Sequence, residues 1–218
     1  MVSSVVKENT MEIKTIVTGV LQTNTYLVIN EGGKDAVLID PAADSGIILE
    51  EIAESDVNLK AILITHGHFD HIGEVDFIRQ HFNVPVYAHK DEANMMKNEK
   101  ENLSLIFFGR SIVAHADSYI DDGDILDFGE GLEFKCIVVP GHTSNSVCFY
   151  NDSYDFLVTG DTLMAGAIGR TDLNNTSAKM LANNIEEKLL VLPDHTVVYP
   201  GHGYKTKIIV EKESNPFL

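Results

Sequence analysis

The chain has 218 residues, of which 33 are acidic and 16 are basic, so its formal net charge is −17. A field of this sign repels phosphate backbones and anionic membrane surfaces at long range, which makes nucleic acid a poor candidate partner. The sequence contains no apolar stretch of membrane-spanning length, and the opening segment MVSSVVKENTMEIK lacks the apolar core of a signal peptide. We therefore expect a soluble cytoplasmic protein that binds neither nucleic acid nor a membrane.

A chain of this length can bury a substantial core, and we expect a single domain over residues 1–218, with residues 1–10 as a loose extension before Met11. The two cysteines, Cys136 and Cys148, lack the spacing of metal ligands. We expect both to be reduced and buried.

In the first half, strands are predicted at apolar runs rich in β-branched residues that end in Gly, Asn, Asp or Pro. These runs are Glu12–Thr18, Thr25–Ile29, Ala36–Ile39, Ala61–Thr65 and Val84–Ala88. Apolar residues at helical spacing predict helices over Ser45–Glu54, with Asp44 as the N-cap, and over Val75–Phe82.

The second half begins with a predicted helix over Lys90–Lys100 and a loop over residues 101–117. Within this loop we expect the apolar residues Leu105–Phe108 to join the core, although a place in a long loop also suits a lid over a cleft. The remaining predicted elements are strands at Leu132–Val139, Ser146–Tyr150, Asp155–Thr159 and Thr196–Tyr199, and a helix over Ser177–Leu190. This order predicts an α/β protein with two sheets packed face to face and helices outside them.

The segment THGHFDHIG, which directly follows the strand AILIT, is the densest group of potential metal ligands. Alternate positions of an extended turn point the same way, so His66 and His68 can share one metal ion. Asp70 and His71, at the start of the following helix, can then address a second ion nearby.

Three later segments each place one further potential ligand just beyond a predicted strand. His142 lies in PGHTSNS, Asp161 in TGDTL and His202 in YPGHG. Loops at strand ends often collect functional groups from distant parts of a chain. Glycines beside each of these residues let the backbone approach a crowded site closely.

The pattern HxHxDH, then GH, GD and GHG in this order, resembles the metallo-β-lactamase superfamily. The resemblance implies a four-layered αβ/βα sandwich and two metal ions. It assigns His66, His68 and His142 to the first ion, Asp70, His71 and His202 to the second, and Asp161 to both.

GRTD at Gly169–Asp172 and the closing NPFL are similar to the short glyoxalase II-like (hydroxyacylglutathione hydrolase-like) branch of that superfamily. This likeness implies hydrolysis of a small-molecule thioester such as S-lactoylglutathione by a hydroxide held between the metals. Asp70 would be the catalytic residue that orients the hydroxide. A histidine-rich set of ligands suits zinc, and iron or manganese would also be accepted.

Recognition of glutathione is the point at which this sequence departs from longer glyoxalase II enzymes, which carry a C-terminal helical domain with basic contacts. Here only sixteen residues follow His202. Arg170 and Lys205 are the candidate substrate contacts, with Lys207 and Arg110 as further nearby cations; pairing with Asp172 is the favoured role for Arg170.

Other functions of the same superfamily remain as alternatives. One is a persulfide dioxygenase with a single iron, against which the complete ligand set argues. A phosphodiesterase or ribonuclease is disfavoured by the negative charge. A β-lactamase is disfavoured because the common zinc lactamases share a cysteine at the position that Asp161 occupies here. The sequence leaves the acyl group, the thiol carrier, the metal and the oligomeric state open.

Overall fold

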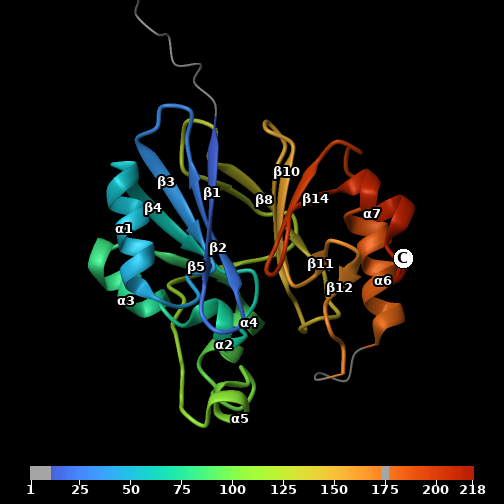
Figure 1. Cartoon of the computed structure of the whole chain (residues 1–218), viewed down its shortest axis with the longest axis horizontal. Coiled ribbons are helices and arrows are strands. Elements are labelled where there is room, and N and C mark those ends of the chain that lie inside the picture. The colour runs from blue at the N-terminus through green and yellow to red at the C-terminus, as the bar shows by residue number, and fades with distance from the viewer. Residues whose placement is uncertain (1–10, 173–176) are drawn as a thin grey trace, which may run out of the picture.

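The computed structural model describes residues 11–172 and 177–218, so the expected loose extension over residues 1–10 lies outside the described residues. The N-terminal half forms a six-stranded sheet in the order β1-β2-β3-β4-β5-β6 (Figure 1). Its strands are β1 Glu12–Thr18, β2 Thr23–Ile29, β3 Asp35–Ile39, β4 Asn58–Leu63, β5 Val86–His89 and β6 Ser118–Ile120. β1, β2 and β3 pair antiparallel, and β3 to β6 run parallel. The carboxyl ends of the parallel strands therefore meet at one edge.

The C-terminal half forms a second six-stranded sheet in the order β14-β13-β10-β9-β8-β7. Its strands are β7 Ile125–Asp127, β8 Glu133–Val138, β9 Val147–Asn151, β10 Phe156–Gly160, β13 Val197–Pro200 and β14 Thr206–Lys207. Neighbouring strands pair antiparallel except β10 and β13, which are parallel. A small hairpin of β11 Leu163–Met164 and β12 Ala167–Ile168 follows β10.

Alternating side chains along the strands create a core on each face of both sheets. In β3, Leu38 faces a helical layer while Val37 and Ile39 face the other sheet. The first helical layer contains α1 Ser45–Ser55, α3 Val75–Phe82 and α4 Lys90–Met96. On the far side, α6 Ala178–Lys188 and α7 Ile208–Ser214 pack against the second sheet (Figure 1). The order helix, sheet, sheet, helix is the predicted four-layered αβ/βα sandwich.

The prediction of an irregular loop over residues 101–117 is wrong in part, because Ser104–Phe108 forms the helix α5. A helix of five residues is too short to show a helical period in the sequence. The expectation that Leu105–Phe108 joins the core is also wrong, since these four side chains are 40–68% exposed.

Two smaller expectations have different outcomes. Asp44 does not cap α1 through its side chain; its carboxylate instead accepts a hydrogen bond from the backbone N–H of Gly19 at 3.1 Å. Cys136 and Cys148 are free and buried, as predicted. No helix in the described part of the chain is long and apolar enough to cross a bilayer.

Candidate metal centre

The potential ligands come together where the strand-end loops of the two sheets face each other, around the short helix α2 Phe69–Ile72. His66 and His68 follow β4 of the first sheet. His142, Asp161 and His202 follow β8, β10 and β13 of the second sheet. The paired sheets fix these loops, so residues distant in sequence converge on one site.

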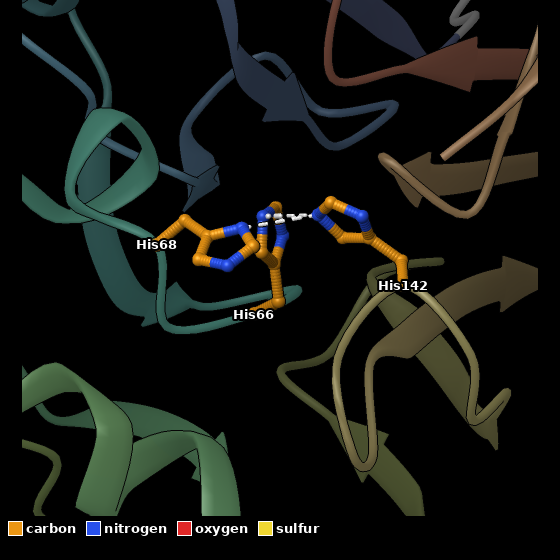
Figure 2. Close-up of side chains that lie close together, drawn as sticks. All are labelled: His66, His68 and His142. Atoms are coloured by element: carbon orange, nitrogen blue, oxygen red, sulfur yellow. Dashed lines mark hydrogen bonds between the residues drawn. The ribbon is translucent and has the colours of Figure 1, made fainter. Parts of the chain in front are cut away.

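The first trio consists of His66, His68 and His142, all of them buried. Nε2 of His142 lies 3.3 Å from Nε2 of His66 and 3.1 Å from Nδ1 of His68. Figure 2 shows the three rings pointing toward one another, with the first two on one loop and the third on the loop opposite. Three imidazole nitrogens thus share one small volume.

The second trio consists of Asp70, His71 and His202. Oδ2 of Asp70 lies 3.6 Å from Nε2 of His71 and 3.2 Å from Nε2 of His202. Thr23 donates a hydrogen bond of 3.3 Å from Oγ1 to the same carboxylate oxygen. This trio therefore combines two nitrogens with one oxygen.

Asp161 lies between the two trios and directs one oxygen to each. Its Oδ1 is 3.4 Å from Nε2 of His71 and 3.5 Å from Nε2 of His202, whereas its Oδ2 is 3.7 Å from Nε2 of His142. Gly201 leaves room for this arrangement, because a Cβ at this position would overlap Oδ1 of Asp161 and the ring of His71. The glycine before His202 is thus needed for close approach.

Hydrogen bonds on the outer side of the histidine rings fix which nitrogen faces the site. Nδ1 of His142 donates to the carbonyl of Arg170 at 3.0 Å, and Nδ1 of His202 donates to the carbonyl of Leu21 at 3.1 Å. With Nδ1 as the donor on the outer side, Nε2 of each ring faces the site, where it can bind a metal ion.

The donor set fits a cation because several of its buried inward atoms have no partner in the described part of the protein. Nε2 of His71 and Oδ1 of Asp161 are buried and have no hydrogen-bond partner. A buried polar atom without a partner is costly, and a bound cation would pair with both of these atoms. The residues of both trios fit bound metal ions in this respect.

Burial also sets the charge of these groups. Burial disfavours the protonated, positively charged form of an imidazole ring. It lowers the pKa of His66 well below its ordinary value and that of His68 to about 3, so both rings are neutral. At His71, burial is outweighed by the carboxylates of Asp70 and Asp161, which raise its pKa well above the ordinary value. The first trio offers neutral nitrogens, and the second attracts positive charge.

Asp40 supports both trios and was not identified from the sequence. Its Oδ2 accepts hydrogen bonds from Nδ1 of His71 at 2.9 Å and from Oγ1 of Thr65 at 2.6 Å. Oγ1 of Thr65 lies 3.0 Å from Nδ1 of His66, so one carboxylate orients a ring of each trio. Asp40 follows β3, the neighbour of β4. A polar residue at the end of an adjacent parallel strand was the signal available in the sequence.

Glu92 of α4, also missed, connects the loops that carry the first trio. The fully buried carboxylate accepts hydrogen bonds from the N–H of Gly67 at 2.9 Å, from Oγ1 of Thr143 at 2.7 Å and from the N–H of Asn145 at 3.1 Å. Burial raises the pKa of Glu92. Nothing in the helical pattern distinguishes this glutamate from an exposed one.

The two predicted substrate contacts have different surroundings. Arg170 forms a bidentate pair with Asp172, with both N···O distances at 2.8 Å, and it lines the hollow beside His68 and Asp161. The Lys205 side chain is exposed, and its Nζ lies 5.9 Å from the centre of the Tyr199 ring. Lys205 is not among the residues that line this hollow.

The hollow in front of both trios, called the metal hollow below, has a volume of about 360 Å³. Its lining includes Asp70, His142 and His202, together with the apolar residues Leu21 and Phe107. Residues 18–202, which contain all the residues of both trios, match the Metallo-beta-lactamase superfamily. The chain belongs to the metallo-β-lactamase superfamily.

Relatives within the metallo-β-lactamase superfamily cover nearly all of the chain. "Probable metallo-hydrolase YqgX" from Bacillus subtilis is 37% identical over 201 residues, covering 92% of this chain and 94% of the relative. "Hydroxyacylglutathione hydrolase GloC" from Haemophilus influenzae is 34% identical over 210 residues, covering 95% and 98%. The crystal structure of the BLEG-1 B3 metallo-beta-lactamase superposes with a TM-score of 0.90 at 37% identity, covering 95% and 99%.

Proposed function

We propose that this chain is a metal-dependent hydrolase that holds two divalent ions, zinc in the first instance, and cleaves small-molecule thioesters. The observation that carries this proposal is Asp161, whose two oxygens face two separate trios of metal-binding residue types. The proposed ligands are His66, His68 and His142 for one ion and Asp70, His71 and His202 for the other, with Asp161 touching both.

Bound divalent ions would lower the pKa of water toward neutrality and polarise a carbonyl group. The chain supplies the positioning. Asp70 is the proposed catalytic residue, because it lines the metal hollow and its carboxylate can accept a hydrogen bond from the attacking water. Thr23 holds Oδ2 of this carboxylate through a hydrogen bond. No nucleophilic side chain is needed, since the water itself attacks the carbonyl carbon.

Thioesters are proposed as the substrate class because of the relative GloC, which is named as a hydroxyacylglutathione hydrolase. This chain covers 98% of GloC, so the likeness does not depend on any additional domain in that relative. It therefore supports the proposal even though basic residues beyond His202 are few. Arg170 is the proposed polar contact in the metal hollow, where Asp172 holds its guanidinium.

Hydrolysis of β-lactams is a second candidate because of the likeness to the BLEG-1 B3 metallo-beta-lactamase. A β-lactam also presents an acyl carbon to the attacking water, so the same residues would serve. The presence of Asp161 therefore does not exclude β-lactam hydrolysis. It does argue against this activity, because the common zinc lactamases resemble one another in carrying cysteine at this position.

Elemental analysis followed by a substrate panel under anaerobic conditions tests the proposal. The panel contains lactoylglutathione, an acyl-CoA, a β-lactam, a persulfide and a phosphodiester. We expect two metal ions per chain and turnover of a thioester without oxygen. A maximum of one iron per chain with activity only in oxygen would instead establish the dioxygenase, and selective turnover of the β-lactam would establish the second candidate.

A further inference from the structure

We propose that a second hollow beside the metal centre receives an uncharged aliphatic or aromatic group of the substrate, so that the enzyme prefers thioesters carrying such a group. This inference rests on the proposed function, since it assigns the substrate class of the same site. The second hollow, called the side hollow below, lies between the turn that joins β1 to β2, the helix α2 and the residues that end α5 (Figure 1).

The side hollow continues directly from the metal hollow. It has a volume of about 250 Å³, and the two hollows share Leu21, Phe69 and Asp70 in their linings. A substrate whose carbonyl group lies against Asp70 therefore has one of its substituents at the entrance of the side hollow. The size is below that of most complete ligand sites, which suits one group of a molecule.

Aromatic rings line the boundary between the two hollows. The buried Phe69 stacks on Phe107, with ring centres 6.1 Å apart, and meets Phe108 edge-on at 5.1 Å. Phe107 lines the metal hollow, whereas Phe108 lines the side hollow. Phe107 is 56% exposed and Phe108 41% exposed, so apolar surface remains for a substrate group to cover.

The opposite wall is formed by Val20 and Leu21, which are 78% and 50% exposed. The turn that carries them is connected to the metal centre, because the carbonyl of Leu21 accepts the hydrogen bond from Nδ1 of His202. This hydrogen bond fixes the apolar wall relative to a proposed ligand. The wall and the reacting atoms therefore keep a constant separation.

The charges around the side hollow favour a neutral occupant. Two acidic residues that are not proposed ligands, Asp44 and Glu74, line it against a single cation, Arg110, while a bound ion would compensate the charge of Asp70. The guanidinium of Arg110 lies 5.8 Å from the centre of the Phe108 ring. Excess negative charge disfavours the carboxylates of a peptide thiol and the phosphates of a nucleotide-linked thiol, while Arg110 disfavours a cation. An aliphatic or aromatic group meets neither penalty.

The group can belong to the acyl side or to the thiol side of the thioester, and two substrate series distinguish these sources. In one series the acyl chain is lengthened from two to about eight carbons on a fixed small thiol. In the other series, the acyl group is always acetyl and the thiol part of the thioester carries an alkyl chain of increasing length. We expect kcat/KM to rise about fourfold per buried methylene in one series only, until the hollow is filled.

Two variants at exposed positions test the location. Phe108→Ala should reduce the dependence of kcat/KM on chain length, and Val20→Asp should reduce it further by adding a negative charge. Phe77→Ala is the matched control, because Phe77 of α3 is 48% exposed and does not line the side hollow. The control should keep the wild-type dependence. Circular dichroism and metal content verify that all variants are folded and loaded.

The outcomes separate this inference from the proposed function. If short thioesters are hydrolysed and kcat/KM does not depend on chain length in either series, the proposed role of the side hollow is disproved. Thioester hydrolysis as the proposed function is then still supported. A wild-type dependence that persists in both Phe108→Ala and Val20→Asp also disproves the proposed role of the side hollow. If fully metallated protein cleaves no thioester of any length, the proposed function fails and the inference fails with it.

Discussion

The two trios differ in charge and in access to solvent. The first trio presents three imidazole nitrogens, and all of its side chains are buried. The second includes the carboxylate of Asp70 and the side chain of His202, which is 26% exposed. Of the six residues that form the two trios, only Asp70 lines both the metal hollow and the side hollow. Under the proposed function, the first trio would retain an ion, and the second would bring an ion, a water molecule and a substrate together.

The supports of the two trios differ as well. Asp40 orients His71 directly and His66 through Thr65, so it serves both trios. Glu92 connects only the loops that carry the first trio. Substitutions can therefore be directed at both trios, at the second alone or at the first alone.

Asp161→Ala should have the largest effect, because it removes the one side chain that faces both trios. We expect both ions to be lost or weakly bound. Turnover should fall by more than the factor of about 10²–10⁴ that one positioned proton acceptor contributes. Metal content and kcat/KM are the measurements. Asp152→Ala, at an acidic residue paired with Tyr150 away from the trios, is the control. Full metal content with a near-normal rate would disprove the bridging role.

Asp70→Asn should affect the second trio alone. The amide keeps the size of the side chain but loses its charge, so the second ion should bind more weakly while the first stays bound. Turnover should fall about 10²–10⁴-fold, and circular dichroism should be unchanged. Thioester hydrolysis at the wild-type rate would show that the second trio does not supply the proton acceptor.

Asp40→Asn should weaken both ions without removing a proposed ligand. Loss of an outer partner of a metal-binding histidine typically costs about 10–100-fold in metal affinity. Competition with a chelator measures the two affinities separately. If only the second ion binds more weakly, the link through Thr65 to His66 is not functional, and Asp40 supports the second trio only.

Glu92→Gln should have the smallest effect and should be confined to the first trio. A glutamine oxygen can replace one carboxylate oxygen, but its amide group cannot accept a hydrogen bond from the remaining buried donors. An unsatisfied buried donor costs roughly 1–3 kcal/mol, so the free energy of unfolding should fall by about that amount. Chemical denaturation of the metal-free protein measures this, and chelator competition measures the first ion. An equal loss of affinity at the second ion would contradict the assignment.

The sequence allowed the proposed ligands to be named because they are concentrated in short motifs after strands. His66, His68, Asp70 and His71 lie in one segment, and glycines accompany His142, Asp161 and His202. These positions stay predictions as ligands, although the structure brings them together. The order of apolar runs predicted two facing sheets with helices outside them, and the resemblance to the superfamily implied the four-layered sandwich. Family membership confirms this fold. The single domain over residues 1–218 also stays a prediction.

The supporting residues could not be predicted because their roles depend on tertiary contacts. Asp40 is one aspartate after a strand, and only its neighbour β4 places it beside His71. Glu92 acts through donors on two loops distant in sequence, Gly67 and Thr143. α5 was missed because its apolar residues face solvent rather than a core, which reverses the usual relation between hydrophobicity and burial.

The contacts between the first hairpin and β13 have a consequence for biosynthesis. Asn24 and Tyr26 each donate a side-chain hydrogen bond to the carbonyl of Pro200, across more than 170 residues. A ribosome synthesises the chain from the amino terminus at about 5–20 residues per second. The first trio is therefore incomplete until His142 has emerged, and the second until His202 has. Under the proposed function, metal binding would follow synthesis of both sheets, and metal content would report whether the first hairpin of a newly made chain has met β13.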